Sequence, residues 1–234
     1  MNNIFKKLVY RSDLLGKLLG YFNTKFQFSL LSFYNDKKTV DLIKTIKNEV
    51  DLAFFPFEAF LIYSITKSQS KLEGEMAEVG VYQGGSAKLI CDAKENKKLH
   101  LFDTFEGLPH VSEIDTHFGT KFCNDKEFNN TSEEAVKKFL SCYNNVYIYK
   151  GKFPETTEPV MKSKFSFVHL DVDLYESTLS CLKFFYPRLI NGGIILTHDF
   201  HTKGVNTAFK EFFQNKVIAI IELAGSQCMV IKIE

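Results

Sequence analysis

The sequence predicts an α/β protein in which a doubly wound sheet follows an N-terminal helical extension. Up to about residue 74 the apolar residues recur at helical spacing. After that point, short apolar runs of the kind found in buried strands alternate with segments of helical period. This alternation is typical of a doubly wound, mostly parallel sheet. We therefore predict a helical extension over residues 1–74 and a sheet domain over residues 75–234.

The extension starts with an amphipathic pattern. Its apolar positions share one helical face, and basic residues occupy the other faces, as in Ile4, Leu8, Leu14, Leu15, Leu18, Leu19 and Phe22 against Lys6, Lys7, Arg11 and Lys17. Packing against its own domain or a second subunit is the commoner outcome, so we expect a homo-oligomer. Weak contact with a membrane surface is the alternative. The apolar segment at 52–65 is too short for a transmembrane span and contains Pro56 and Glu58, which predicts a buried helix.

The predicted elements of the sheet domain follow one another in a regular order. Strands are expected at 75–81, 98–103, 145–151, 165–173 and 192–200, and helices at 85–96, 132–143, 175–189 and 205–215. Two final runs, 216–223 and 227–234, predict an antiparallel pair. The irregular stretch 106–130 is too long for an ordinary connection, which favours a lid or binding loop, or else disorder.

Composition excludes several classes of function. The net charge of +1, with lysines spread among acidic residues, gives no field that would attract nucleic acid. The five cysteines are widely separated and form no C-x-x-C pair, so we interpret them as free thiols in a reducing compartment. The N-terminus lacks the sustained apolar core of a signal peptide. These features predict a cytoplasmic protein.

A glycine-rich turn and a strand-end acid outline a nucleoside-type pocket. In "EVGVYQGGS" (78–86) a strand runs into glycines 80, 84 and 85 before a helix, which lets the backbone approach a ligand closely. A simple tight turn would look the same. Asp103, 18 residues beyond Gly85, ends the next strand, where doubly wound proteins bind ribose hydroxyls. Together the two features favour the pocket.

A cluster of acids is expected at the same edge of the sheet. The stretch "FVHLDVDLYEST" (167–178) ends a strand at Asp171 and Asp173, and "ILTHDF" ends the neighbouring strand at His198 and Asp199. Since ligands of open α/β sheets bind beyond the carboxyl ends of the strands, these side chains should converge there. Their oxygens suit Mg²⁺ or a similar hard cation.

Two of these residues have an alternative structural interpretation. Asp173 and Glu176 have the spacing of a capping box, so Asp173 could begin the next helix rather than take part in chemistry. Asp171 lies too early for that spacing. His198 could ligate a metal directly or orient another ligand.

Several of these motifs resemble those of one known family. "EVGVYQGGSA", "LFDTFEGLP", "NVYIYKGKFPETT" and "HLDVDLYEST" follow one another as in the macrocin O-methyltransferase (TylF/MycF-like) family, over about residues 55–213. That family uses S-adenosylmethionine (SAM) and a divalent metal to methylate sugar hydroxyls. The resemblance implies a class I SAM-methyltransferase (Rossmann-like) fold, with a seven-stranded sheet whose last strand is antiparallel.

The resemblance also implies a role for each matching residue. SAM would be bound by Glu78, Gly80, Val81, Tyr82, Gly84, Ser86, Asp103, Thr104, Gly151, Phe153 and Asp171. Asp171, Asp199 and His198 would hold the metal, expected to be Mg²⁺ or another divalent cation, and Asp173 would be the general base beside Asp171. One departure is visible, since the family carries Asp-Asp where this chain has His198–Asp199. A neutral imidazole is a softer ligand than a carboxylate.

The sequence therefore favours a SAM-dependent O-methyltransferase that acts on a hydroxyl of a glycosyl group, in a secondary metabolite or a surface glycan. The 106–130 segment, termed the acceptor loop below, would then close over the acceptor. Phe118, Phe122 and Phe128 in that loop make a catechol-like phenol an alternative acceptor. A non-catalytic nucleoside-binding or scaffold protein is the alternative from another class of function.

Overall fold

The structure is a computed structural model that describes residues 13–233. The beginning of the amphipathic pattern, including Ile4, Lys6, Lys7, Leu8 and Arg11, lies outside the described residues. The centre of the fold is a seven-stranded sheet of order β5-β2-β1-β6-β7-β9-β8. The strands are β1 Glu75–Val79, β2 Leu99–Asp103, β5 Val146–Lys150, β6 Phe165–Leu170, β7 Leu189–Thr197, β8 Ile220–Glu222 and β9 Cys228–Ile231.

The strand directions confirm the predicted doubly wound topology. Strands β5, β2, β1, β6 and β7 are parallel, β9 runs antiparallel to β7, and β8 runs antiparallel to β9. The last strand is therefore antiparallel, as expected. The central strands are short apolar runs because both of their faces are covered. All six residues of β6, for example, are buried.

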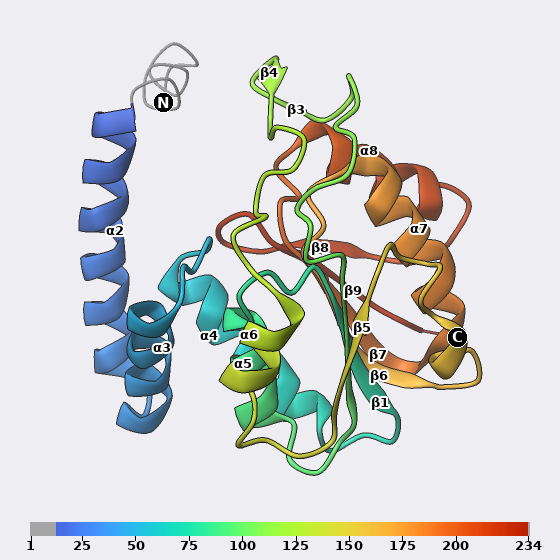
Figure 1. Cartoon of the computed structure of the whole chain (residues 1–234), viewed down its shortest axis with the longest axis horizontal. Coiled ribbons are helices and arrows are strands. Elements are labelled where there is room, and N and C mark those ends of the chain that lie inside the picture. Colours follow the sequence, from blue (N-terminus) through green and yellow to red (C-terminus); the bar gives the residue numbers. More distant parts are fainter. Residues whose placement is uncertain (1–12, 234) are drawn as a thin grey trace.

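Two helical layers cover the sheet (Figure 1). On one face lie α4 Pro56–Gln69, α5 Gly85–Ala93 and α6 Glu133–Phe139, and on the other lie α7 Tyr175–Phe185 and α8 Lys203–Phe213. Each layer has its own apolar cluster. One joins Ile62 of α4 to Met76 and Leu196 of the sheet, and the other joins Phe185 of α7 to Phe209 of α8. Short 3₁₀ turns at Glu158–Val160 and Tyr186–Arg188 complete the connections.

The helical extension is partly continuous with the sheet domain. It consists of α2 Asp13–Tyr34, α3 Lys37–Glu49 and α4, and Ile43 and Ile46 of α3 belong to the same core cluster as Met76. The division at residue 75 therefore remains a prediction. Of the segment at 52–65, residues 56–65 form the start of α4, with Pro56 at its first position, and bury Ile62 as expected of a buried helix, whereas residues 52–55 precede the helix.

Helix α2 lies at the outer side of the molecule (Figure 1). It exposes a row of large apolar side chains, Leu14, Leu18, Phe22, Phe26 and Phe33. The homo-oligomer and the membrane-surface contact expected from this helix both remain predictions. Within residues 13–233, the structure contains no helix with the length and apolar character needed to cross a membrane. All five cysteines are free, as predicted.

The acceptor loop is an ordered segment that contains a small hairpin. Strands β3 Thr116–His117 and β4 Thr120–Lys121 pair at its tip. Leu108 and residues 126–127 exchange backbone hydrogen bonds at its base. Val111 and Cys123 of the loop pack against Leu174, which precedes α7. The stretch is therefore structured rather than disordered, and its role as a lid or binding loop stays a prediction.

Candidate active site

The backbone places the candidate residues in one line across the carboxyl edge of the sheet. The hydrogen-bond ladder continues one residue beyond four strands. Gly80 N donates to Phe102 O (3.0 Å), Asp171 N to Val79 O (2.9 Å), His198 N to Leu170 O (2.8 Å) and Gly151 N to Asp103 O (2.9 Å). The residues just past β1, β5, β6 and β7 are therefore in register with one another. The predicted convergence at this edge is confirmed.

The glycine turn is held by the acid at the end of β2. Asp103 Oδ2 accepts hydrogen bonds from the backbone N–H groups of Val81 (2.6 Å) and Tyr82 (2.9 Å), and Oδ1 accepts one from Phe105 (2.7 Å). Gly80 and Gly84 both have φ of 85°, in the left-handed region that favours glycine. Asp103 thus shapes the turn from below. Since a carboxylate has about four acceptor sites, it retains capacity for a ligand hydroxyl.

Gly80 leads to a prediction about stability. A Cβ there would collide with the carbonyl oxygen of Asp171, and the left-handed backbone alone costs about 1–2 kcal/mol for other residues. We expect Gly80→Ala to lower the free energy of unfolding by about 2–3 kcal/mol in urea titrations. Gly119→Ala is the matched control, because Gly119 has φ of 77° with no heavy atom within 4 Å of a Cβ. Equal losses in the two variants would contradict the collision.

A cavity of about 300 Å³ opens beside this turn. Most of the predicted cofactor residues line it, namely Gly80, Val81, Tyr82, Ser86, Asp103, Thr104, Gly151, Phe153 and Asp171. Glu78 and Gly84 do not. Glu78 is fully buried and bonds His169 Nδ1 through Oε1 (2.7 Å). The assignment of these residues to SAM remains a prediction.

Two further segments line the cavity. From the acceptor loop come Gly107, Leu108, Pro109, Phe122, Cys123, Glu127 and Phe128. From the connection between α3 and α4 come residues 51–54, which the sequence did not indicate. Phe118 of the loop lies outside this cavity and instead lines a second cleft with His201 and Lys203. The acceptor side of the cavity therefore has an apolar wall built from two distant parts of the chain.

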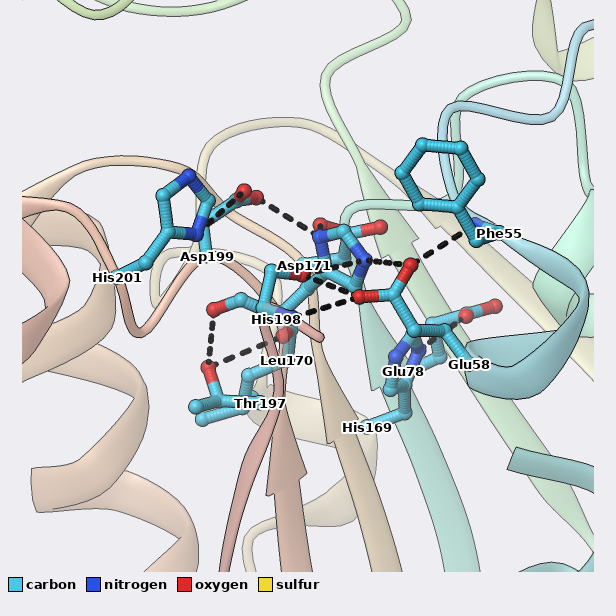
Figure 2. A network of polar contacts seen from close by, with 11 residues as sticks. Phe55, Glu58, Glu78, His169, Leu170, Asp171, Thr197, His198, Asp199 and His201 are labelled. Carbon is cyan, nitrogen blue, oxygen red and sulfur yellow. Dashed lines mark hydrogen bonds and ion pairs between the residues drawn. The ribbon is translucent and has the colours of Figure 1, made fainter. Parts of the chain in front are cut away.

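Asp171, Asp199 and His198 lie close together (Figure 2), and all three line the cavity. His198 Nδ1 lies 3.0 Å from Asp199 Oδ2 and 3.6 Å from Asp171 Oδ1. Asp173 also lines the cavity. Asp173 (φ 58°) and Asp199 (φ 56°) both have left-handed backbones. Aspartate tolerates this region better than most residues, and such strain is concentrated at functional sites.

Glu58 from α4 completes the network, and the sequence analysis missed this role. Its Oε2 accepts a hydrogen bond from Phe55 N (2.8 Å), and its Oε1 accepts two from Ser226, from N (2.8 Å) and Oγ (2.7 Å). His198 Nε2 lies 3.1 Å from Ser226 Oγ and 3.7 Å from Glu58 Oε2. The sequence signal was a lone acid in an otherwise apolar helix, since such a charge must find a buried partner.

The charges in this cluster shift one another's protonation. Burial opposes the charged form of His198, but the charges of Asp199 and Asp171 outweigh it and raise the pKa of His198 well above its usual value. Burial and the charge of Asp199 raise the pKa of Asp171 to about 6. Burial, Asp199 and Asp171 raise the pKa of Asp173 well above the ordinary range. The charge of His198 outweighs burial at Asp199 and lowers its pKa.

Asp173 does not cap the following helix, so the capping-box alternative is wrong. The N-cap of α7 is Leu174, and neither Asp173 nor Glu176 supplies a side-chain cap. Instead, the acceptor is Asp115, which lies in the acceptor loop. Its Oδ1 accepts a hydrogen bond from Tyr175 N (2.8 Å) at the start of α7. The carboxyl group of Asp173 is therefore not used by the helix and remains in the cavity.

The donor set fits a divalent cation. One atom each from Asp171, His198 and Asp199 can be chosen so that all three lie within 4.8 Å of one another. Carboxylate oxygens are the donors that Mg²⁺ prefers. His198 Nδ1 is engaged with Asp199, so it could ligate only as neutral imidazole and after giving up that contact. The two carboxylates are the stronger candidates, and ligation by His198 remains a prediction from the sequence.

Comparison with known proteins gives one family and several similar chains. The model of the family described as macrocin-O-methyltransferase (TylF) matches residues 62–223. The 8-demethyl-8-(2,3-dimethoxy-alpha-L-rhamnosyl)-tetracenomycin-C 4'-O-methyltransferase of Streptomyces olivaceus is 28% identical over 151 residues. That match spans 59% of this chain and 58% of the relative, so the chain covers little more than half of that protein's length.

Two solved structures have the same fold. The calicheamicin methyltransferase CalS11 superposes with a TM-score of 0.66 at 17% identity, covering 94% of this chain and 93% of that one. The O-methyltransferase from Bacillus cereus in complex with SAH gives 0.60 at 10% identity, covering 91% and 100%. At these identities the likeness concerns the fold alone, and it confirms the class I SAM-methyltransferase architecture.

The family match covers more than two thirds of the chain and includes the glycine turn, Asp103, the acceptor loop and the acidic cluster. These are the features that the structure brings together around one cavity. The chain belongs to the macrocin-O-methyltransferase (TylF) family.

Proposed function

We propose that the protein is a SAM-dependent O-methyltransferase that methylates a hydroxyl of a glycosyl group. The observation that carries this proposal is that one cavity joins a glycine turn braced by Asp103 to the carboxyl groups of Asp171, Asp173 and Asp199. The first half is suited to a nucleoside cofactor and the second to deprotonation of a hydroxyl. The family and the rhamnosyl-tetracenomycin methyltransferase support the class of acceptor.

The cavity residues would divide the work. The glycine turn and Asp103 would bind SAM, which supplies an activated methyl group and leaves as SAH. Asp173 takes the proton of the acceptor hydroxyl while the oxygen of that hydroxyl forms its bond to the methyl carbon. Burial and the neighbouring Asp199 and Asp171 raise the pKa of Asp173, which makes it a stronger base than an ordinary aspartate. The acceptor loop excludes water from the cavity and orients the acceptor.

A divalent cation is part of this proposal. Asp171 and Asp199 would hold it, with His198 as the third candidate donor. Such an ion would supply positive charge that favours the deprotonated form of the acceptor hydroxyl. Sugar hydroxyls are weak acids, so Asp173 would benefit from that assistance.

The apolar wall supports one second candidate, a catechol-like phenol as the acceptor. Phe122 and Phe128 line the cavity together with Leu108. The two phenylalanine rings give the kind of aromatic slot that a catechol ring would need. The proposed cofactor, SAM, and the proposed base, Asp173, are the same for both classes of acceptor. A panel of glycosides and catechols, assayed for SAH release, separates the two acceptor classes.

The test of the proposed function combines binding and turnover. The wild-type protein should bind SAM in calorimetry and release SAH when a glycoside acceptor is present. Asp171→Ala should lower turnover about 10²-fold and SAM affinity far less, because the Asp171 carboxyl group belongs to the acidic cluster as well as to the predicted cofactor residues. Absence of SAM binding by the wild type would instead favour the non-catalytic alternative. A fully active Asp171→Ala variant in chelator would refute the metal-assisted mechanism.

A further inference from the structure

Asp115 connects the acceptor loop to the start of α7. This residue is only 2% exposed. Oδ2 accepts hydrogen bonds from the N–H (3.0 Å) and the hydroxyl (2.5 Å) of Ser112, and Oδ1 accepts one from Tyr175 N (2.8 Å). Ser112 lies three residues away in the loop, whereas Tyr175 lies 60 residues farther along the chain. One carboxylate therefore holds both the loop and the helix.

The start of α7 has no cap of its own. Leu174 stands at the N-cap position and has no side-chain oxygen, so the first N–H groups of the helix depend on an outside acceptor. A carboxylate at this end of a helix also interacts favourably with the helix dipole. Asp115 supplies that acceptor. As a result, Asp173 lies outside the helix with its carboxyl group at the cavity.

Apolar packing joins the same two segments. Leu174 is buried in a small cluster with Val111 and Cys123 of the acceptor loop. Leu174, which makes this contact, is the residue between Asp173 and Tyr175 in the chain. The loop and the turn at 171–175 therefore share both a hydrogen bond and a packed interface.

We propose that Asp115 is a positioning residue that caps α7 in place of Asp173 and so couples the acceptor loop to the orientation of the base. This inference rests on the proposed function, because it takes Asp173 as the group that accepts the proton. Docking of the loop fixes Asp173, and loss of the cap would leave both the loop and the base misplaced. Asp115 itself has no role in the transfer.

Gly204 near the start of α8 provides an independent way to disturb this contact. A Cβ on Gly204 would collide with Asp115 Oδ1 and would lie 3.2 Å from Tyr175 N. Glycine is otherwise unfavourable inside a helix, so alanine would be the better residue for α8 by itself. The absence of a side chain at position 204 leaves the space that the Asp115 carboxylate occupies.

The experiment is a double-mutant cycle with Asp115→Ala and Gly204→Ala. Three quantities are measured, namely kcat and KM for methyl transfer and the rate of amide hydrogen exchange in peptides covering residues 172–178. Each single variant should lower kcat about 10–100-fold, change SAM affinity less than about threefold, and speed exchange at the start of α7. The double variant should be no worse than Asp115→Ala alone, because the carboxylate that a methyl group at position 204 would displace is already gone.

Two further variants sharpen the result. Asp115→Asn keeps a carbonyl oxygen for Tyr175 N and should recover most of kcat. Asp125→Ala is the matched control, since Asp125 Oδ1 accepts a loop hydrogen bond from Val111 N (2.9 Å) in the same loop but makes no bond to α7. It should leave kcat and exchange in 172–178 near wild type, whatever it does to the loop locally.

The outcomes separate this inference from the proposed function. If the wild type transferred no methyl group, the proposed function would fail, and unchanged exchange at 172–178 in Asp115→Ala would independently refute the cap. If the wild type is active, an Asp115→Ala variant with normal kcat overturns the inference. Additive losses in the cycle overturn it as well, because they mean that residues 115 and 204 act separately.

Discussion

Asp173→Asn is expected to lower kcat by about 10²–10⁴-fold, the range usual for loss of a general base, while SAM affinity changes little. The substitution keeps the shape of the side chain and removes its ability to hold a proton. Asp173 lines the cavity, and its carboxyl group neither caps α7 nor bonds the glycine turn. The measurement is steady-state SAH release beside calorimetric SAM binding.

The pH dependence of kcat/KM in the wild type is a second test of Asp173 as the base. Burial, with Asp199 and Asp171 nearby, raises the pKa of Asp173 well above 3.8. A base works only when deprotonated, so kcat/KM should fall as the pH drops through this raised pKa. An unperturbed aspartate would show the fall only near about pH 4. In Asp173→Asn the residual activity should lack that acidic limb.

Stability should not follow activity in this variant. Burial and the nearby Asp199 and Asp171 disfavour the charged form of Asp173, as its raised pKa shows, and a neutral amide does not carry that cost. We expect the melting temperature of Asp173→Asn to equal or exceed that of the wild type.

Glu127→Gln is the control for the loss of kcat, since Glu127 is another carboxylate that lines the cavity. A similar loss of kcat in Glu127→Gln would mean that cavity charge, rather than a base at position 173, drives the reaction.

Local pattern was sufficient to predict the sheet and its working edge. The apolar runs predicted at 98–103, 165–173 and 192–200 contain the parallel strands β2, β6 and most of β7, because strands that are buried on both faces consist largely of apolar residues. Once the strands are parallel, their carboxyl ends must meet at one edge. For that reason the convergence of Asp171 with Asp199 could be inferred without any knowledge of contacts.

Long-range hydrogen bonds were the part that pattern could not predict. The spacing of Asp173 and Glu176 is a valid capping signature, yet Asp115 provides the cap from another segment. Nothing in the residues around Asp115 indicates this. The surroundings of His198 were hidden for the same reason, since Ser226 is separated from Glu58 by 168 residues. Sequence can show that a buried polar group needs a partner but cannot choose the partner.

Glu58→Ala is expected to lower the free energy of unfolding by about 3–5 kcal/mol, the usual loss when one member of a buried charged network is removed. The Glu58 side chain is 3% exposed, and its two oxygens serve Phe55 N and both donors of Ser226. Alanine would leave these donors without acceptors and His198 without one of its flanking carboxylates. Urea denaturation at pH 7 measures the loss.

The dependence of this loss on pH identifies its cause. Burial opposes ionisation of Glu58, but the hydrogen bond and charge of His198, with the donors of Phe55 and Ser226, outweigh it and lower the pKa from 4.5 to about 2. Because the folded pKa is depressed, its contribution is fully present above pH 4.5 and disappears as the pH falls toward 2. The difference between 4.5 and about 2 corresponds to about 3 kcal/mol.

Glu58→Gln separates the charge from the hydrogen bonds. The amide keeps an acceptor for one set of donors and has no charge to lose, so the stability gap between wild type and Glu58→Gln should narrow steadily from about pH 5 to about pH 2. A gap of constant size over that range would mean that packing and hydrogen bonds alone account for Glu58. A narrowing gap would show that α4 stabilises the charged site through Glu58, so that the helical extension and the candidate active site are energetically one unit.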